Sequence, residues 1–116
     1  MKGYHYVCKL SELPNRRGRK FSLEEEDIAI FRIGNDVYAV SNICPHNKSQ
    51  YMYDGYIDEE MYLACPIHGW KYNLLTGEPP FDCGNTTGKL PVYETRIING
   101  EVWVKINTPN RKWSLF

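Results

Sequence analysis

The chain has 116 residues, the length of one compact domain that buries roughly two thirds of its unfolded surface around a single core. Its 14 lysines and arginines balance 14 aspartates and glutamates, which excludes the strongly basic surface of a nucleic-acid binder or a polybasic membrane-binding protein. The first ten residues lack the continuous apolar stretch of a secretory signal, and no apolar run approaches the roughly 20 residues that cross a bilayer. We therefore expect a single cytoplasmic domain over residues 1–116, bound to no membrane and no nucleic acid.

The first half of the chain predicts strands. Residues 16–20 and 24–27 carry charges of opposite sign on either side of an apolar triplet, and we interpret them as a solvated hairpin or loop edge without a function. Residues 26–33 and 37–43 are rich in β-branched side chains. The residues between them, Gly34-Asn35-Asp36, tolerate the positive backbone angles of a tight turn, so the two runs predict a β-hairpin.

Residues 42–83 have a different composition, because turn formers, histidines and cysteines gather there around two short runs, 55–57 and 61–64. The acidic residues 58–60 predict a turn that joins these runs, so that the two runs pair antiparallel. Pairing brings Cys44 and Cys65 near each other. We expect this stretch to be a subdomain inserted into a β-sandwich base.

The last part of the chain predicts a second hairpin. Residues 91–98 and 101–106 flank Asn99-Gly100, the strongest short hairpin signal that a sequence offers. Three apolar side chains of the second run alternate and are expected to point inward, namely Val102, Val104 and Ile106. Residues 107–116 are expected to be a tail. Helical periodicity is weak throughout, so the chain is expected to be all-β.

Two cysteine–histidine pairs are the most informative residues of the chain. They are Cys44-Pro45-His46 and Cys65-Pro66-Ile67-His68, separated by residues 47–64. Four cysteines without an export signal favour metal ligation or free thiols over a disulfide framework. A thiolate and a histidine with one or two residues between them leave the backbone on opposite sides of a turn, so each pair fits two neighbouring metal atoms better than one. Two facing loops would then give one iron two sulfurs and the other iron two nitrogens.

The pattern C-x-H followed by C-x-x-H resembles the Rieske iron–sulfur family, whose clusters have mixed histidine and cysteine ligation. The resemblance extends to residues 69–72, which are similar to the family's cluster loop, and to 76–80, which are similar to its proline-rich covering loop. It implies an all-β, antiparallel Rieske-type sandwich or incomplete barrel that holds one [2Fe-2S] cluster. The implied ligands are Cys44 and Cys65 on the inner iron and His46 and His68 on the outer iron.

A structural zinc ion bound by two cysteines and two histidines is the competing interpretation. Zinc sites usually pair Cys with Cys and His with His, whereas this chain alternates them, so the spacing favours the iron–sulfur cluster. Cys8 and His5 lie outside this constellation, and we interpret them as a small buried thiol and an ordinary polar residue. Cys83 follows the Pro79-Pro80 loop and is interpreted as an inert free thiol.

The residues around the ligands bear on the reduction potential. By the resemblance, high-potential relatives carry a disulfide cysteine in each loop where this chain has Ser49 and Ile67, and a serine where it has Trp70. Tyr72 matches a family tyrosine whose hydroxyl can donate to a cysteine sulfur. We therefore predict a potential at the low end of the family range, which is about −150 to +300 mV.

Three functions remain open, ranked in this order with the first two close together. The first is a ferredoxin that passes electrons from a reductase to an oxygenase-type enzyme. The second is a small subunit of an NAD(P)H-dependent nitrite reductase-like complex, because residues 42–46 also resemble that group. The third is a domain kept for its structure after losing the cluster. We expect electron transfer without independent substrate chemistry, since the sequence shows no nucleophile with a base and no nucleotide-binding glycine loop.

Overall fold

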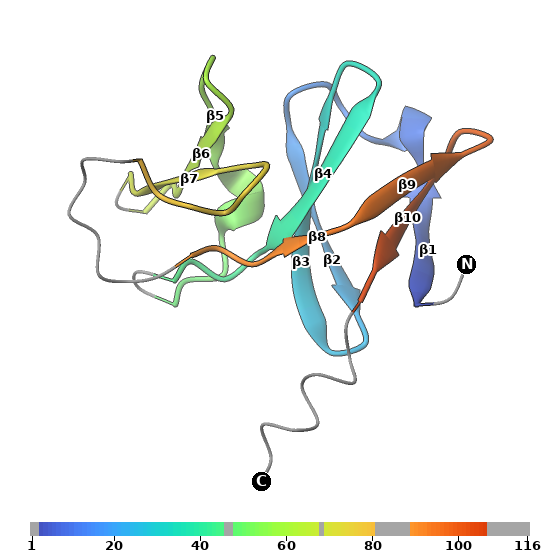
Figure 1. The fold of residues 1–116 in the computed structure, drawn as a ribbon, viewed down its shortest axis with the longest axis horizontal. Helices are drawn as coiled ribbons and strands as arrows, with labels where there is room; N and C mark the ends of the chain where they lie inside the picture. The colour runs from blue at the N-terminus through green and yellow to red at the C-terminus, as the bar shows by residue number, and fades with distance from the viewer. Residues whose placement is uncertain (1–2, 46–47, 68, 81–88, 107–116) are drawn as a thin grey trace, which may run out of the picture.

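The computed structural model describes residues 3–45, 48–67, 69–80 and 89–106. Ten strands in these residues form three sheets with antiparallel pairing, as Figure 1 shows. The first sheet has the order β1 (Tyr4–Lys9), β10 (Glu101–Lys105) and β9 (Thr95–Ile98). The second has the order β2 (Gly18–Leu23), β3 (Glu26–Ile33), β4 (Asp36–Ser41) and β8 (Val92–Tyr93). The third has the order β5 (Tyr56–Ile57), β6 (Tyr62–Ala64) and β7 (Lys71–Asn73). These sheets confirm the predicted all-β class.

The first predicted hairpin forms β3 and β4, with Ile33 opposite Asp36 across the turn. Gly34 lies in the left-handed region of backbone space at φ 63°, which a glycine adopts without steric cost. β2 pairs with β3 in a second hairpin, and its turn residues Glu24 and Glu25 also have positive φ. The charged stretches around this turn are therefore the solvated hairpin that the sequence indicates.

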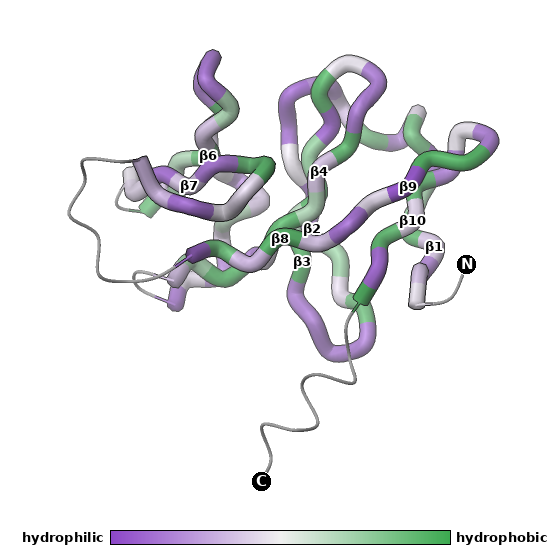
Figure 2. Tube along the Cα trace, viewed as in Figure 1, coloured by the Kyte–Doolittle hydropathy of each residue, from purple (hydrophilic) through white to green (hydrophobic). Residues whose placement is uncertain are grey.

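The second sheet is the middle layer of the molecule, because β3, one of its two inner strands, is buried on both faces. Along β3, Ile28 and Ile30 belong to the core that the second sheet shares with the first. Ala29 and Phe31 alternate with them and belong to a separate core on the side of β5, β6 and β7. Hydrophobic segments of β4 and β8 lie at the centre of the chain trace (Figure 2). The uninterrupted apolar run of β3 thus contributes side chains to both hydrophobic cores.

The second predicted hairpin turns at Asn99 (φ 53°) and Gly100 (φ 76°), and Val102, Val104 and Ile106 are buried, as predicted. The run 91–98, however, is two strands rather than one. β8 pairs with β4 in the middle sheet, whereas β9 pairs with β10 in the first sheet. The break falls at Glu94, and the hydroxyl of Thr95 then donates to the carbonyl of Val37 at 2.9 Å. This change of sheet joins the two layers of the base.

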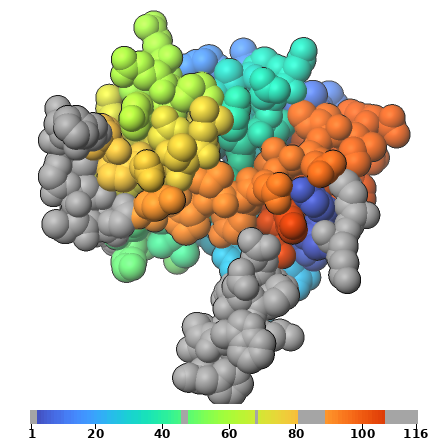
Figure 3. Space-filling view, viewed as in Figure 1, coloured from blue at the N-terminus to red at the C-terminus, as the bar shows by residue number. Residues whose placement is uncertain are grey.

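The third sheet forms a lobe on the other face of the middle layer, seen in green and yellow in Figures 1 and 3. β5 and β6 pair antiparallel across the acidic turn, as predicted, with Ile57 opposite Leu63. β7 adds a third strand that was not predicted and places Tyr72 opposite Leu63. Two short 3-10 turns complete the described elements, namely η1 (Leu10–Glu12) and η2 (Met52–Asp54). Within the part of the chain that the structure describes, no helix could span a bilayer.

Candidate functional site

Cys44 begins a short loop after β4 that is closed by two backbone hydrogen bonds. The N–H of Cys44 donates to the carbonyl of Ser49 at 2.9 Å, and the carbonyl of Cys44 accepts from the N–H of Lys48 at 2.8 Å. Lys48 has a φ of 63°, in the left-handed region where residues other than glycine are uncommon. The cysteine is thus tied to the residue five positions further along the chain.

Cys65 begins a second loop, after β6, with the same closure. The N–H of Cys65 donates to the carbonyl of Trp70 at 2.8 Å, and the carbonyl of Cys65 accepts from the N–H of Gly69 at 2.8 Å. Gly69 has a φ of 76°, so the fourth residue after the cysteine is left-handed in both loops. The two loops therefore present their cysteines from equivalent backbone positions.

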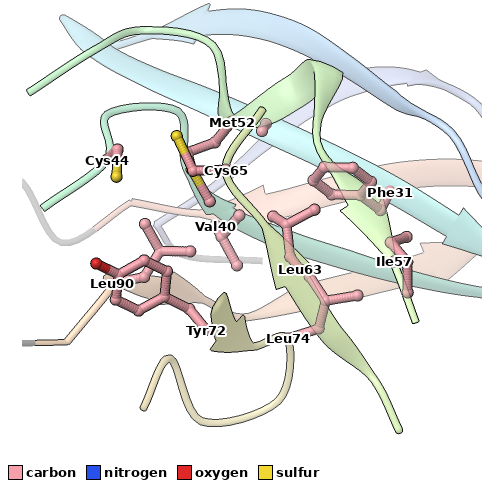
Figure 4. Packing of buried hydrophobic residues seen from close by; sticks show 11 residues of the cluster. Phe31, Val40, Cys44, Met52, Ile57, Leu63, Cys65, Tyr72, Leu74 and Leu90 are labelled. Carbon is pink, nitrogen blue, oxygen red and sulfur yellow. The ribbon is translucent and has the colours of Figure 1, made fainter. Parts of the chain in front are cut away.

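The two thiols lie in one apolar environment. Cys44 and Cys65 are 0% and 1% exposed and belong to the same hydrophobic cluster. Neither forms a disulfide with a described residue. Figure 4 shows their sulfurs at the same end of that cluster. The side chain of Ser49, in the first loop, reaches Cys65 in the second, with 3.8 Å between Oγ and Sγ. The predicted approach of the two cysteines is confirmed.

The other predicted ligands, His46 and His68, lie outside the described residues, and so does Cys83. The structure therefore describes the two sulfur positions of the predicted site.

Cys8 is 5% exposed and packs in the other core, between the first and second sheets. Burial, followed by the charge of Glu12, raises the pKa of the Cys8 thiol despite the opposing charge of Arg19. Cys8 fits the interpretation of a small buried thiol.

Buried side chains cover one side of the two cysteines. Tyr72 on β7 is fully buried, and Figure 4 shows its hydroxyl directed toward the cysteine end of the cluster. Leu90 is also fully buried and lies beside the ring. Trp70 is partly buried and packs against the same cluster. These side chains keep water from the sulfurs, and a low local dielectric strengthens every hydrogen bond that the sulfurs accept.

Asn42 connects the first loop to the middle sheet, and the sequence reasoning missed it. It is fully buried, and its side-chain N–H groups donate to the carboxylate of Asp27 at 3.1 Å and to the carbonyl of Gln50 at 2.8 Å. Its side-chain oxygen accepts from the N–H of Tyr53 at 2.8 Å. The sequence could have indicated Asn42, because it is a polar residue that directly follows an apolar strand and stands two positions before Cys44. Asn42 holds the loop that carries Cys44 in place from both sides.

Asp58 organises the turn that supports the second loop. Its carboxylate accepts hydrogen bonds from the N–H of Glu60 at 2.8 Å and of Tyr62 at 3.0 Å, and it contacts the ammonium of Lys71 at 3.2 Å. Burial raises the pKa of the Asp58 carboxyl, but the backbone donors of Tyr62 and Glu60 and the charge of Lys71 together outweigh it and hold the pKa below its ordinary value. The ionised carboxylate joins β5, β6 and β7 into one unit.

The donor set fits an iron–sulfur cluster. Clusters of this kind take thiolates from short loops and stand in surroundings that exclude water. Here two buried cysteines are presented by equivalent loops at one end of an apolar core. A histidine follows each of them by two or three residues in the sequence. The chemistry of the residues and the shape of their loops agree.

Comparison with known proteins decides the family. The family model described as the Rieske-like [2Fe-2S] domain matches residues 3–105. The chain belongs to the Rieske family. The family assignment identifies one Rieske-type [2Fe-2S] cluster as the cofactor, and it confirms the resemblance that the two cysteine–histidine pairs carry.

The relatives and structural neighbours include ferredoxin subunits of dioxygenases. The chain is 33% identical over 82 residues to the anthranilate 1,2-dioxygenase ferredoxin subunit of Burkholderia cepacia, covering 71% of this chain and 72% of that one. It resembles the ferredoxin in a solved complex of reduced oxygenase and oxidized ferredoxin of carbazole 1,9a-dioxygenase, with a TM-score of 0.75, 26% identity and coverage of 90% and 94%. A Mycobacterium tuberculosis chain described as an NADH-dependent nitrite reductase small subunit has the same fold, with a TM-score of 0.79, 23% identity and coverage of 89% and 94%.

Proposed function

We propose that this Rieske protein is a one-electron carrier whose cluster is held by Cys44, His46, Cys65 and His68. It takes electrons from a reductase and passes them to an oxygenase-type terminal enzyme. The observation that carries the proposal is the pair of equivalent loops that bring two buried cysteines together. Ferredoxin subunits of dioxygenases among the relatives support the choice of partner.

The ligands divide the work of the site. The thiolates of Cys44 and Cys65 would hold the inner iron, and Tyr72 and Leu90 would exclude water from that side. His46 and His68 would hold the outer iron. When bound, the cluster supplies reversible uptake of one electron, and its two neutral imidazoles raise its potential above that of four-cysteine clusters. The chain's own residues set the geometry and the local electrostatics.

We also propose that residues 1–116 are one domain in which residues 42–83 form the cluster-binding subdomain. The separate core around β5, β6 and β7 supports this division, since it includes Cys44 and Cys65 but excludes the residues between the first and second sheets. The base of the subdomain is anchored by Asn42. Residues 107–116, proposed as the tail of the domain, lie outside the described residues.

A second candidate function is the small electron-transfer subunit of a nitrite reductase-like complex, located like the carrier in the cytoplasm. The shared fold with the Mycobacterium tuberculosis chain favours it. The two functions differ in their electron acceptor. A purified reductase and terminal oxygenase that turn over only when this chain is added would support the carrier, whereas stable co-purification with a large reductase subunit would support the second candidate.

The test of the site begins with the purified protein. We expect two irons and two acid-labile sulfides per chain, visible absorption, and a paramagnetic signal after reduction with dithionite. Cys44→Ser and Cys65→Ser should lose the visible absorption. Cys8→Ala, a change to the thiol of the other core, should keep it. One zinc ion per chain in a colourless protein would instead support the structural zinc site and overturn the proposal.

A further inference from the structure

One side-chain contact joins the two cysteine loops. Ser49 belongs to the loop of Cys44, where its carbonyl accepts the N–H of Cys44 at 2.9 Å. Its hydroxyl extends the other way, and its Oγ lies 3.8 Å from the Sγ of Cys65. Ser49 is partly buried, so water competes poorly for this contact. The backbone of Ser49 thus contacts Cys44, and its side chain contacts Cys65.

The direction of this hydrogen bond follows from the ligand chemistry. Between a free thiol and a hydroxyl, either group could donate. A cysteine bound to iron is a thiolate, which has no proton and can only accept. The hydroxyl of Ser49 must therefore be the donor when Cys65 is a ligand. Hydrogen bonds to an ionised acceptor are roughly twice as strong as those between neutral groups.

We propose that Ser49 is a positioning residue that raises the reduction potential of the site by donating a hydrogen bond across the two loops to the sulfur of Cys65. The proposal rests on the proposed function. When bound, the cluster would take up one electron from the reductase, with no proton transferred to Ser49. The Ser49 hydroxyl would then donate to a more negative sulfur, and it would stabilise the reduced state more than the oxidised state.

The experiment compares two substitutions that differ in the hydroxyl. Ser49→Ala removes the donor, and Ser49→Thr keeps it. We expect voltammetry to give a lower midpoint potential for Ser49→Ala and a potential close to that of the original protein for Ser49→Thr, with equal iron and sulfide content in all three. Ser22→Ala, at an exposed position of β2, is the matched control and should leave the potential unchanged.

A second measurement reads the bond itself. Exchange of water for deuterium oxide should shift the iron–sulfur stretching bands of the original protein and of Ser49→Thr in resonance Raman spectra, and this shift should be smaller in Ser49→Ala. Equal potentials in Ser49→Ala and the original protein would overturn the inference. Loss of the cluster from Ser49→Ala would overturn it too, because it assigns Ser49 to tuning and not to retention. An original protein without iron and sulfide would instead overturn the proposed function.

Discussion

The side-chain amide of Asn42 donates a hydrogen bond to the carboxylate of Asp27, with 3.1 Å between Nδ2 and Oδ2. The backbones of the same two residues are joined as well, by the N–H of Asn42 and the carbonyl of Asp27 at 2.8 Å. Asp27 lies on β3, an inner strand of the middle sheet, and Asn42 lies two residues before Cys44. The first cysteine loop is therefore held by an inner strand of the base.

Asn42→Ala should destabilise the protein and loosen the first loop. The change removes a buried amide and leaves the N–H of Tyr53 and the carbonyl of Gln50 without their side-chain partner. A buried polar group that loses its partner costs about 1–3 kcal/mol. We expect a lower urea midpoint and faster loss of visible absorption at the same temperature. Asn35→Ala, in the exposed turn after β3, is the control, and equal effects of the two changes would contradict this role.

Gly77→Ala should be far more damaging than Gly34→Ala, although both glycines have positive φ. A Cβ at Gly34 meets nothing within 4 Å, so only the left-handed backbone is penalised, at about 1–2 kcal/mol. A Cβ at Gly77 would collide with the carbonyl oxygen of Leu90, whose N–H donates to the carbonyl of Gly77 at 2.8 Å. Urea unfolding of the two variants measures the difference. Equal urea midpoints would contradict this prediction, because they would show that the Leu90 backbone moves away from the added Cβ at little cost.

Local turn chemistry made much of the fold predictable. Asn99, Gly100 and Gly34 have positive φ where the sequence indicates hairpins, and these signals act over a few residues. The family signature also lies within short loops, so the two cysteines could be recognised from spacing alone. Each of these features depends on neighbours in the sequence.

What could not be predicted depends on residues far apart in the chain. The break at Glu94 follows from pairing with two different sheets, and residues 91–98 alone do not reveal it. β7 is three residues long with one buried side chain, Tyr72, and its pairing is fixed by the closed loop of Cys65. The partners of Asn42 are up to 15 residues away. Tertiary contacts, and not local preference, determine these features.

The reduction potential should lie at the low end of the Rieske range of about −150 to +300 mV. Trp70 stands where high-potential relatives have a serine, and it packs against the core. Its side chain has no hydroxyl to offer, so the contact from Ser49 raises the potential only within this lower range. Voltammetry at neutral pH measures it. A midpoint near the top of the range would contradict the prediction.

Asp58→Asn should lower stability at neutral pH and have less effect in acid. Burial raises the pKa of the Asp58 carboxyl, but the backbone donors of Tyr62 and Glu60 and the charge of Lys71 lower it further than burial raises it. The pKa is therefore below its ordinary value. A carboxyl with a lowered folded pKa contributes stability that is fully present above its unfolded pKa, about 3.9, and is lost as the pH falls through the lower folded value. Asparagine keeps an acceptor oxygen but not the charge, so we expect a loss of about 1 kcal/mol at pH 7.

Urea midpoints of the original protein and Asp58→Asn, compared at pH 7 and pH 3, measure this charge effect. The comparison between variants cancels changes common to both, such as loss of the cluster in acid. Glu59→Gln removes the same charge from the same turn and should have little effect at either pH, because Glu59 is exposed. A difference between the original protein and Asp58→Asn that stays constant from pH 7 to pH 3 would mean that the carboxylate charge does not hold the three short strands together.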